Sequence, residues 1–244
     1  MRYTKSHDSS KAAKAERRAH RASRHRTGHD HGLEISSLSG PVDPRLLRGT
    51  HEAFSGVDLG GPWSEVAPMV LPLLKRVRHP FPAEAAPIHL RVPPGVWTGF
   101  GIDVGPAWAH VSRDLMVGWG VDEATILGTA LENLRQRVLS DPPRVERATF
   151  ADTAATIIQA QGWASALILA PDRLASILGD APRMLLAPVR NALIALPEDV
   201  EIDLAVAIWD TFAEGSPDEL DVDPLRWTGS GVVAFLDEPR ALVN

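Results

Sequence analysis

The first 32 residues of the chain contain no Leu, Ile, Val or Phe. A segment of this composition cannot bury enough apolar surface to offset the entropy lost when it becomes ordered. We therefore expect residues 1–32 to be a disordered tail, so that the fold arises from the rest of the 244 residues. Residues 33–62 are rich in Gly, Pro and Ser and are predicted to be a linker. Residues 63–244 are predicted to form a single domain.

The tail differs from the remainder in charge. Residues 1–32 carry nine Lys and Arg against three acidic residues, whereas the remainder carries 16 against 28. A basic tail of this kind could neutralise nucleic-acid phosphates without sequence specificity, or could simply be a solvated segment that aids solubility. Tyr3 is its single aromatic residue, so base stacking is not favoured. Weak nucleic-acid contact through the tail is kept as one alternative function.

Composition excludes several other classes of chemistry. The chain has no Cys, which removes disulfides, thiolate metal sites and a cysteine nucleophile. No apolar run approaches the roughly 18 residues of a membrane span, and no apolar segment follows the basic amino-terminal stretch. We therefore expect a cytoplasmic protein without membrane contact. Because the body histidines are scattered and the tail does not preorganise His25, His29, Asp30 and His31, neither a metal nor a cofactor is predicted.

The spacing of apolar residues predicts four helices. A helix beginning near Pro68 is indicated by Val66, Val70, Leu74 and Val77. The clearest helix runs from Asp122, a good N-cap, to Leu139, and its apolar stripe consists of Ala124, Leu127, Leu131, Leu134 and Val138. Two more helices are expected at residues 171–178 and, in preference to a strand, at 198–213.

Short apolar runs between turn residues predict the strands, which we place at residues 88–92, 96–104, 107–111, 145–150, 156–159, 184–187, 192–196 and 232–236. Residues 164–169 form a further apolar run whose type stays open. Helices and strands do not alternate regularly along the chain. This order favours an α+β fold in which helices cover a mixed, largely antiparallel sheet.

No catalytic motif stands out. The glycines at 99–101 and 229–231 lack the spacing and the Lys of phosphate-binding loops, and they are better explained as turn or bulge glycines. The acidic residues between Asp218 and Asp223 lack the EF-hand order, which favours a solvated loop. The chain is thus not favoured as an enzyme. A hydrolase with an unrecognised site remains the alternative.

Four segments resemble, in the same order, the YtpQ-like bacterial family of unknown function: Leu71–Leu74, Gly118–Glu123 with Ala130–Arg135, Gly162–Leu167 and Ala187–Ile194. The resemblance covers about residues 63–236. It implies an α+β domain in a bacterial cytoplasm, and it implies no reaction. The chain departs from the family pattern at Asn191, where that pattern carries an acidic residue, so a function that needs this carboxylate is not expected.

These observations favour a non-enzymatic binding or regulatory module. We expect its surface near Trp119, Asn133 and Arg190 to engage a protein or a small ligand. Trp119 lies between two glycines and, of the seven tryptophans, is the one expected to be partly exposed.

Overall fold

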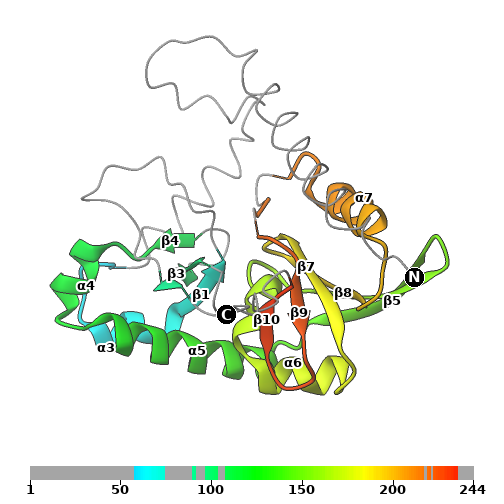
Figure 1. The fold of residues 1–244 in the computed structure, drawn as a ribbon. Helices are drawn as coiled ribbons and strands as arrows, with labels where there is room; N and C mark the ends of the chain where they lie inside the picture. Colours follow the sequence, from blue (N-terminus) through cyan, green and yellow to red (C-terminus); the bar gives the residue numbers. More distant parts are fainter. Residues whose placement is uncertain are drawn as a thin grey trace, which may run out of the picture. The chain divides into compact units, whose positions relative to one another are not determined.

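Described strands fall into two antiparallel sheets (Figure 1). The computed structural model describes residues 58–74, 90–91, 97–103, 108–216, 219–220 and 222–235, all of which belong to one compact unit. The predicted tail therefore lies outside the described residues, as does most of the predicted linker. Helices together with these sheets confirm the α+β class that the sequence predicts.

The first sheet has the order β1–β3–β2, and β4 also pairs with β3. Its strands are β1 (Val70–Leu74), β2 (Leu90–Arg91), β3 (Trp97–Asp103) and β4 (Trp108–His110). The helix predicted to begin near Pro68 is wrong. A short helix α3 (Trp63–Val66) and a 3-10 turn η1 (Ala67–Met69) lead directly into β1, because the run from Val70 to Leu74 is buried throughout and pairs with β3.

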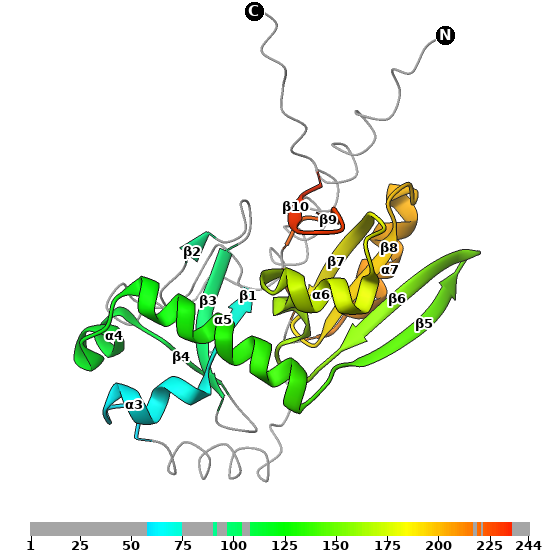
Figure 2. The same cartoon turned by 90° about the horizontal axis from the view of Figure 1, so that it is seen from below.

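The second sheet has six strands in the order β10–β9–β7–β8–β6–β5, and every neighbouring pair is antiparallel. These strands are β5 (Arg144–Phe150), β6 (Thr153–Gln159), β7 (Arg183–Val189), β8 (Ala192–Pro197), β9 (Leu225–Trp227) and β10 (Val232–Ala234). Strand β9 was not predicted. The hairpin of β5 and β6 extends beyond the rest of the sheet in both views (Figures 1 and 2).

Of the four remaining α-helices, three match the sequence prediction in type, whereas the one at Arg113–Trp119 is not predicted. They are α4 (Arg113–Trp119), α5 (Glu123–Ser140), α6 (Pro171–Leu178) and α7 (Ile202–Ala213), and the undecided run is a 3-10 helix, η3 (Ala164–Leu169). The Asp122 carboxylate caps α5 by accepting a hydrogen bond of 2.8 Å from the Thr125 amide. None of the described helices is long and apolar enough to cross a membrane.

Helix α5 runs along β1 and η1 and contributes to two hydrophobic clusters (Figure 2). Its buried residues are Ile126, Ala130, Leu134 and Val138. Ile126 and Ala130 belong to the cluster around Phe100 and Trp119, while Leu134 and Val138 belong to the cluster beneath the six-stranded sheet. The stripe predicted from the sequence is buried at Leu134 and Val138 and packs half-buried against the clusters at Leu127 and Leu131, whereas Ala124 is exposed.

Trp108 joins β4 to the turn before η3. A Cβ atom added at Gly101 or Gly162 would lie 2.8 Å or 2.7 Å from the Trp108 ring, so both positions need the small residue. Gly162 also has φ of +81°, which favours glycine. The Gly-Trp pair at residues 162–163 therefore has a packing role: its glycine receives Trp108, and its Trp163 is buried in the core.

Candidate functional site

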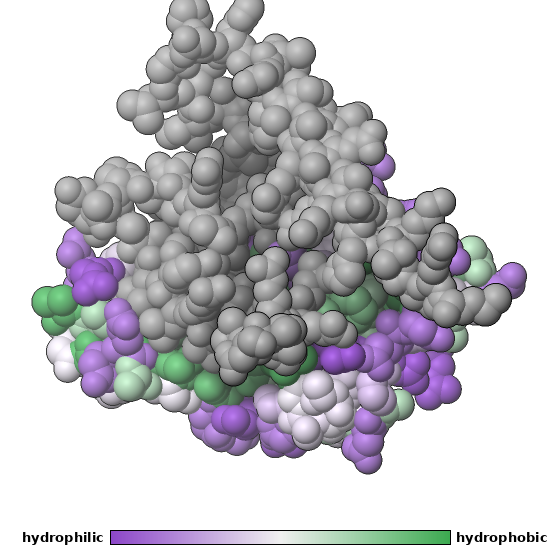
Figure 3. All heavy atoms as spheres, viewed as in Figure 1, coloured by the Kyte–Doolittle hydropathy of each residue, from purple (hydrophilic) through white to green (hydrophobic). Residues whose placement is uncertain are grey.

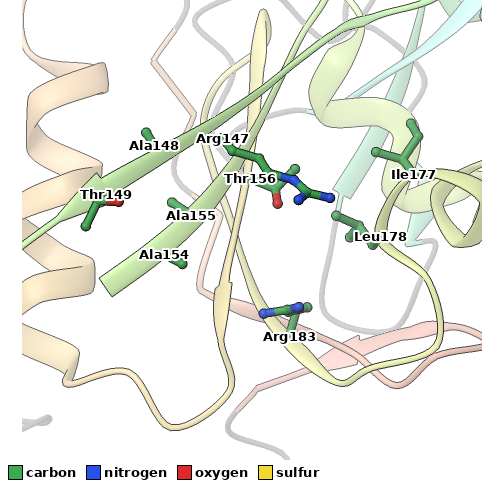
Figure 4. Close-up of a pocket in the computed structure, with 9 residues that line it drawn as sticks. All are labelled: Arg147, Ala148, Thr149, Ala154, Ala155, Thr156, Ile177, Leu178 and Arg183. Atoms are coloured by element: carbon green, nitrogen blue, oxygen red, sulfur yellow. The ribbon is translucent and has the colours of Figure 1, made fainter. Parts of the chain in front are cut away.

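A cavity of about 340 Å³ opens on one face of the six-stranded sheet, where helix α6 ends (Figure 4). Its lining comes from the β5–β6 hairpin, the last residues of α6 and the first residue of β7, and it comprises Arg147, Ala148, Thr149, Ala154, Ala155, Thr156, Ile177, Leu178 and Arg183. Two of these nine side chains are cationic and none is acidic. The pocket therefore presents positive charge to any ligand.

Strand register brings the polar side chains to a common face. Arg147 pairs with Thr156, and Thr156 in turn pairs with Ala195 of β8. Leu185 of β7 is the next partner of Ala195, and Arg183 lies two residues before Leu185. Since side chains alternate between faces and paired residues share one, Arg147, Thr156 and Arg183 project from the same side of the sheet.

The end of α6 forms the apolar wall of this cavity. Helix α6 stops after Leu178 because Gly179 adopts φ +71° and ψ −164°. Trp227, which shares the sheet face with Arg183 through their pairing, donates a hydrogen bond of 2.8 Å from Nε1 to the Gly179 carbonyl. Ile177 and Leu178 are thereby held half-buried beside the arginines.

The turn that precedes Arg183 is also fixed by close packing. A Cβ atom at Gly229 would overlap the Asp180 carbonyl oxygen, and Gly229 has φ of +92°. The β9–β10 turn therefore needs glycine at this position, which supports the sequence interpretation of residues 229–231 as turn glycines. A larger residue at Gly229 would displace the segment that positions Arg183.

Neither arginine of the pocket forms an ion pair with any described residue. The neighbouring Arg144 is different, because it pairs with Glu146 on the opposite face of β5. Arg147 is exposed and Arg183 is half-buried. Arg147 extends from the hairpin toward Leu178 and passes beside Thr156 (Figure 4). Two guanidinium groups and a threonine hydroxyl can all donate hydrogen bonds to an anion.

Trp119 is not the exposed residue that the sequence suggested. Its side chain is 9% exposed and lies in the cluster around Phe100. Its Nε1 donates a hydrogen bond of 3.0 Å to the Leu59 carbonyl, and its ring lies 5.5 Å from that of Trp63. Trp119 therefore joins α4 to the segment before α3. On the face drawn in Figure 3, hydrophobic residues still reach the surface near α4, where Val117 is 69% exposed.

Asn133 connects α5 to the segment where η1 passes into β1. Its Nδ2 donates hydrogen bonds of 2.6 Å to the Ala67 carbonyl and 2.9 Å to the Val70 carbonyl. Both amide hydrogens are thus used within the protein. The structure gives Asn133 a role in holding two elements together.

Arg190 lies in the turn between β7 and β8, where its carbonyl accepts a hydrogen bond of 3.1 Å from the Ser165 amide. The adjacent Asn191 accepts a hydrogen bond of 2.6 Å at Oδ1 from the Gly162 amide. A carboxylate oxygen could accept the same bond, so Asn191 supplies the acceptor without a negative charge.

The structure does not gather the three predicted binding residues into one site. Trp119 belongs to α4, and Arg190 belongs to a turn of the six-stranded sheet. At 1.5 Å per residue, Asn133 lies about 15 Å along α5 from the first residue of that helix. The arginine-lined pocket was missed. Within the described part of the chain, no group of three His, Asp or Glu residues is placed to hold a metal ion.

Fold and pocket together define an α+β protein with a cationic, acid-free cavity on one sheet face. Comparisons of the chain with protein-family models, curated proteins and solved structures found no match.

Proposed function

We propose that this chain is a cytoplasmic, non-enzymatic binding module, and that the cavity lined by Arg147 and Arg183 binds an anionic small ligand. The observation that carries the proposal is the presence of two guanidinium groups, without acidic partners among the described residues, at one cavity. Such groups form strong, charge-assisted hydrogen bonds with carboxylates and phosphates.

The remaining lining supports binding rather than acid–base catalysis. The nine lining side chains include no His, Asp, Glu or Lys. General acid–base catalysis needs a group whose pKa can be brought near the working pH, and guanidinium stays protonated throughout that range. Membership of the YtpQ-like family remains a prediction beside this proposal.

Titration of the full chain with inorganic phosphate at constant ionic strength, followed by amide NMR shifts, tests the proposal. We expect the shifts to centre on Arg147, Thr156, Leu178 and Arg183. Replacing either arginine by Gln should weaken binding about tenfold or more, because a hydrogen bond to a charged group contributes about 1.5–3 kcal/mol.

Arg144→Gln provides a matched control, because Arg144 lies on the same strand but on the opposite face and does not line the cavity. It should leave phosphate binding unchanged. If phosphate shifts no amide of the pocket, or if the control loses as much affinity as Arg147→Gln, the proposal is wrong.

A further inference from the structure

The cavity has a polar part and an apolar part. A ligand that fits it must therefore have more than a negative charge. Arg147, Arg183 and Thr156 supply the donors, whereas Ile177 and Leu178 supply a hydrophobic wall. Both wall residues are half-buried and contact the main core, so their positions are fixed by packing. A matching ligand therefore carries an anionic head and an apolar body.

The charges of the cavity indicate how many negative charges the head carries. Arg147 and Arg183 contribute two permanent positive charges, and no lining side chain offsets them. A carboxylate or a sulfate ester balances one of these charges. A phosphate monoester, whose second pKa is about 6, carries nearly two negative charges at pH 7.5 and offers three acceptor oxygens.

Size sets a limit on the organic part. The volume of about 340 Å³ lies at the lower end of the range of roughly 300–1,000 Å³ found for small-molecule sites. A phosphate group with one ring or a short aliphatic chain is of this scale. We propose that the pocket binds the phosphate monoester of a small molecule with an apolar body. This inference rests on the anion-binding function proposed above and specifies its ligand class.

Three probes separate the contributions of charge and apolar contact. Phenyl phosphate carries both features, phenyl sulfate keeps the ring but has one charge, and inorganic phosphate lacks the ring. In calorimetric titrations of the full chain at pH 7.5 and constant ionic strength, phenyl phosphate should bind at least tenfold more tightly than either of the others. Its affinity should also fall between pH 7.5 and pH 5.5, as the phosphate gains a proton.

Variants assign each contribution to its side chains. Arg147→Gln and Arg183→Gln should each remove most of the preference for phenyl phosphate over phenyl sulfate. Leu178→Ala should weaken the binding of phenyl phosphate severalfold more than it weakens the binding of inorganic phosphate. Leu139→Ala, at an exposed position of α5 outside the cavity, is the control and should alter neither affinity.

The outcomes distinguish the two proposals. Equal affinity for phenyl sulfate and phenyl phosphate would refute the requirement for a dianion while leaving anion binding intact. A phosphotyrosine peptide that binds tenfold more tightly than phenyl phosphate would refute the assignment to a small molecule. Absence of binding for all three probes would refute both this inference and the proposed function.

Discussion

Replacing Asn133 tests which of two roles its side chain has: a role in stability, which the structure gives it, or a place on a binding surface, which the sequence predicts. Its amide makes hydrogen bonds of 2.6 and 2.9 Å to two backbone carbonyls, and its side chain is half-buried. At about 0.5–1.5 kcal/mol for each hydrogen bond, Asn133→Ala should lower the free energy of unfolding by about 2 kcal/mol. For a chain of this size the melting temperature should fall by about 4–8 °C.

Asn133→Asp has nearly the same shape but replaces the donor by a second acceptor. Its carboxylate would face two carbonyl oxygens, so we expect a larger loss of stability than for alanine at neutral pH. This loss should shrink as the pH falls, because the protonated carboxyl can donate one of the two hydrogen bonds. Urea unfolding of the full chain, with the slope checked for constancy, measures both effects.

Gln136→Ala is the matched control for these variants. Gln136 carries an amide on the same helix but is exposed, and its hydrogen bond goes to Glu132 one turn earlier. Its replacement should change stability by less than about 0.5 kcal/mol. If Asn133→Ala behaves like this control, or if it abolishes phosphate binding without destabilising the chain, the structural role is refuted.

Three further predictions concern other parts of the chain. Gly162→Ala should lower the free energy of unfolding, measured by thermal unfolding, by about 2–5 kcal/mol, because the strain of a left-handed backbone adds to the overlap of the new Cβ atom with the Trp108 ring. Gly128→Ala is its control: no atom lies near the added Cβ, so this change should be neutral or stabilising by up to about 1 kcal/mol. Hydrogen bonds from Thr125 lower the pKa of Asp122 below 3.8 in the folded state, so the capping contribution is present above that value and lost as the pH falls through the folded pKa. Asp122→Asn should keep the cap and flatten the acid limb of the stability profile. Deleting residues 1–32 should abolish any salt-sensitive retention of the chain on immobilised DNA, and undiminished retention would contradict the nucleic-acid alternative.

Strand β1 shows where local pattern was insufficient. Val66, Val70 and Leu74 are spaced as on a helix, yet the five residues from Val70 to Leu74 are buried without interruption. A short apolar run of this kind is compatible with either a helix or a buried strand, and the pairing with β3 decides between them. Pro72 fits the strand because β1 lies at the edge of the described sheet, where a missing amide hydrogen is tolerated.

Helix α5 was predictable as a helix, but its buried face was only half predictable. Apolar residues occupy two adjacent stripes of this helix, and their periodicity does not show which stripe is buried. The structure buries Ile126 and Ala130 rather than Ala124, and it leaves Leu127 and Leu131 half-buried. This face is selected by the two clusters that α5 covers, which form from segments far apart in the sequence.

The pocket could not be predicted for a related reason: residue type does not reveal whether a charge is already satisfied. Arg137 donates a hydrogen bond of 2.7 Å to Asp103, and Arg226 lies 2.5 Å from Glu198, so both are neutralised within the chain. Arg147 and Arg183 look no different in the sequence, and the acid next to Arg147, Glu146, pairs with Arg144 instead. Strand register places these two arginines on one face of the sheet, and the cavity that they line lies beside the end of α6. The cationic site therefore arises because the fold brings two arginines to one cavity without an acidic partner among the described residues, and this absence of partners is a property of the tertiary structure.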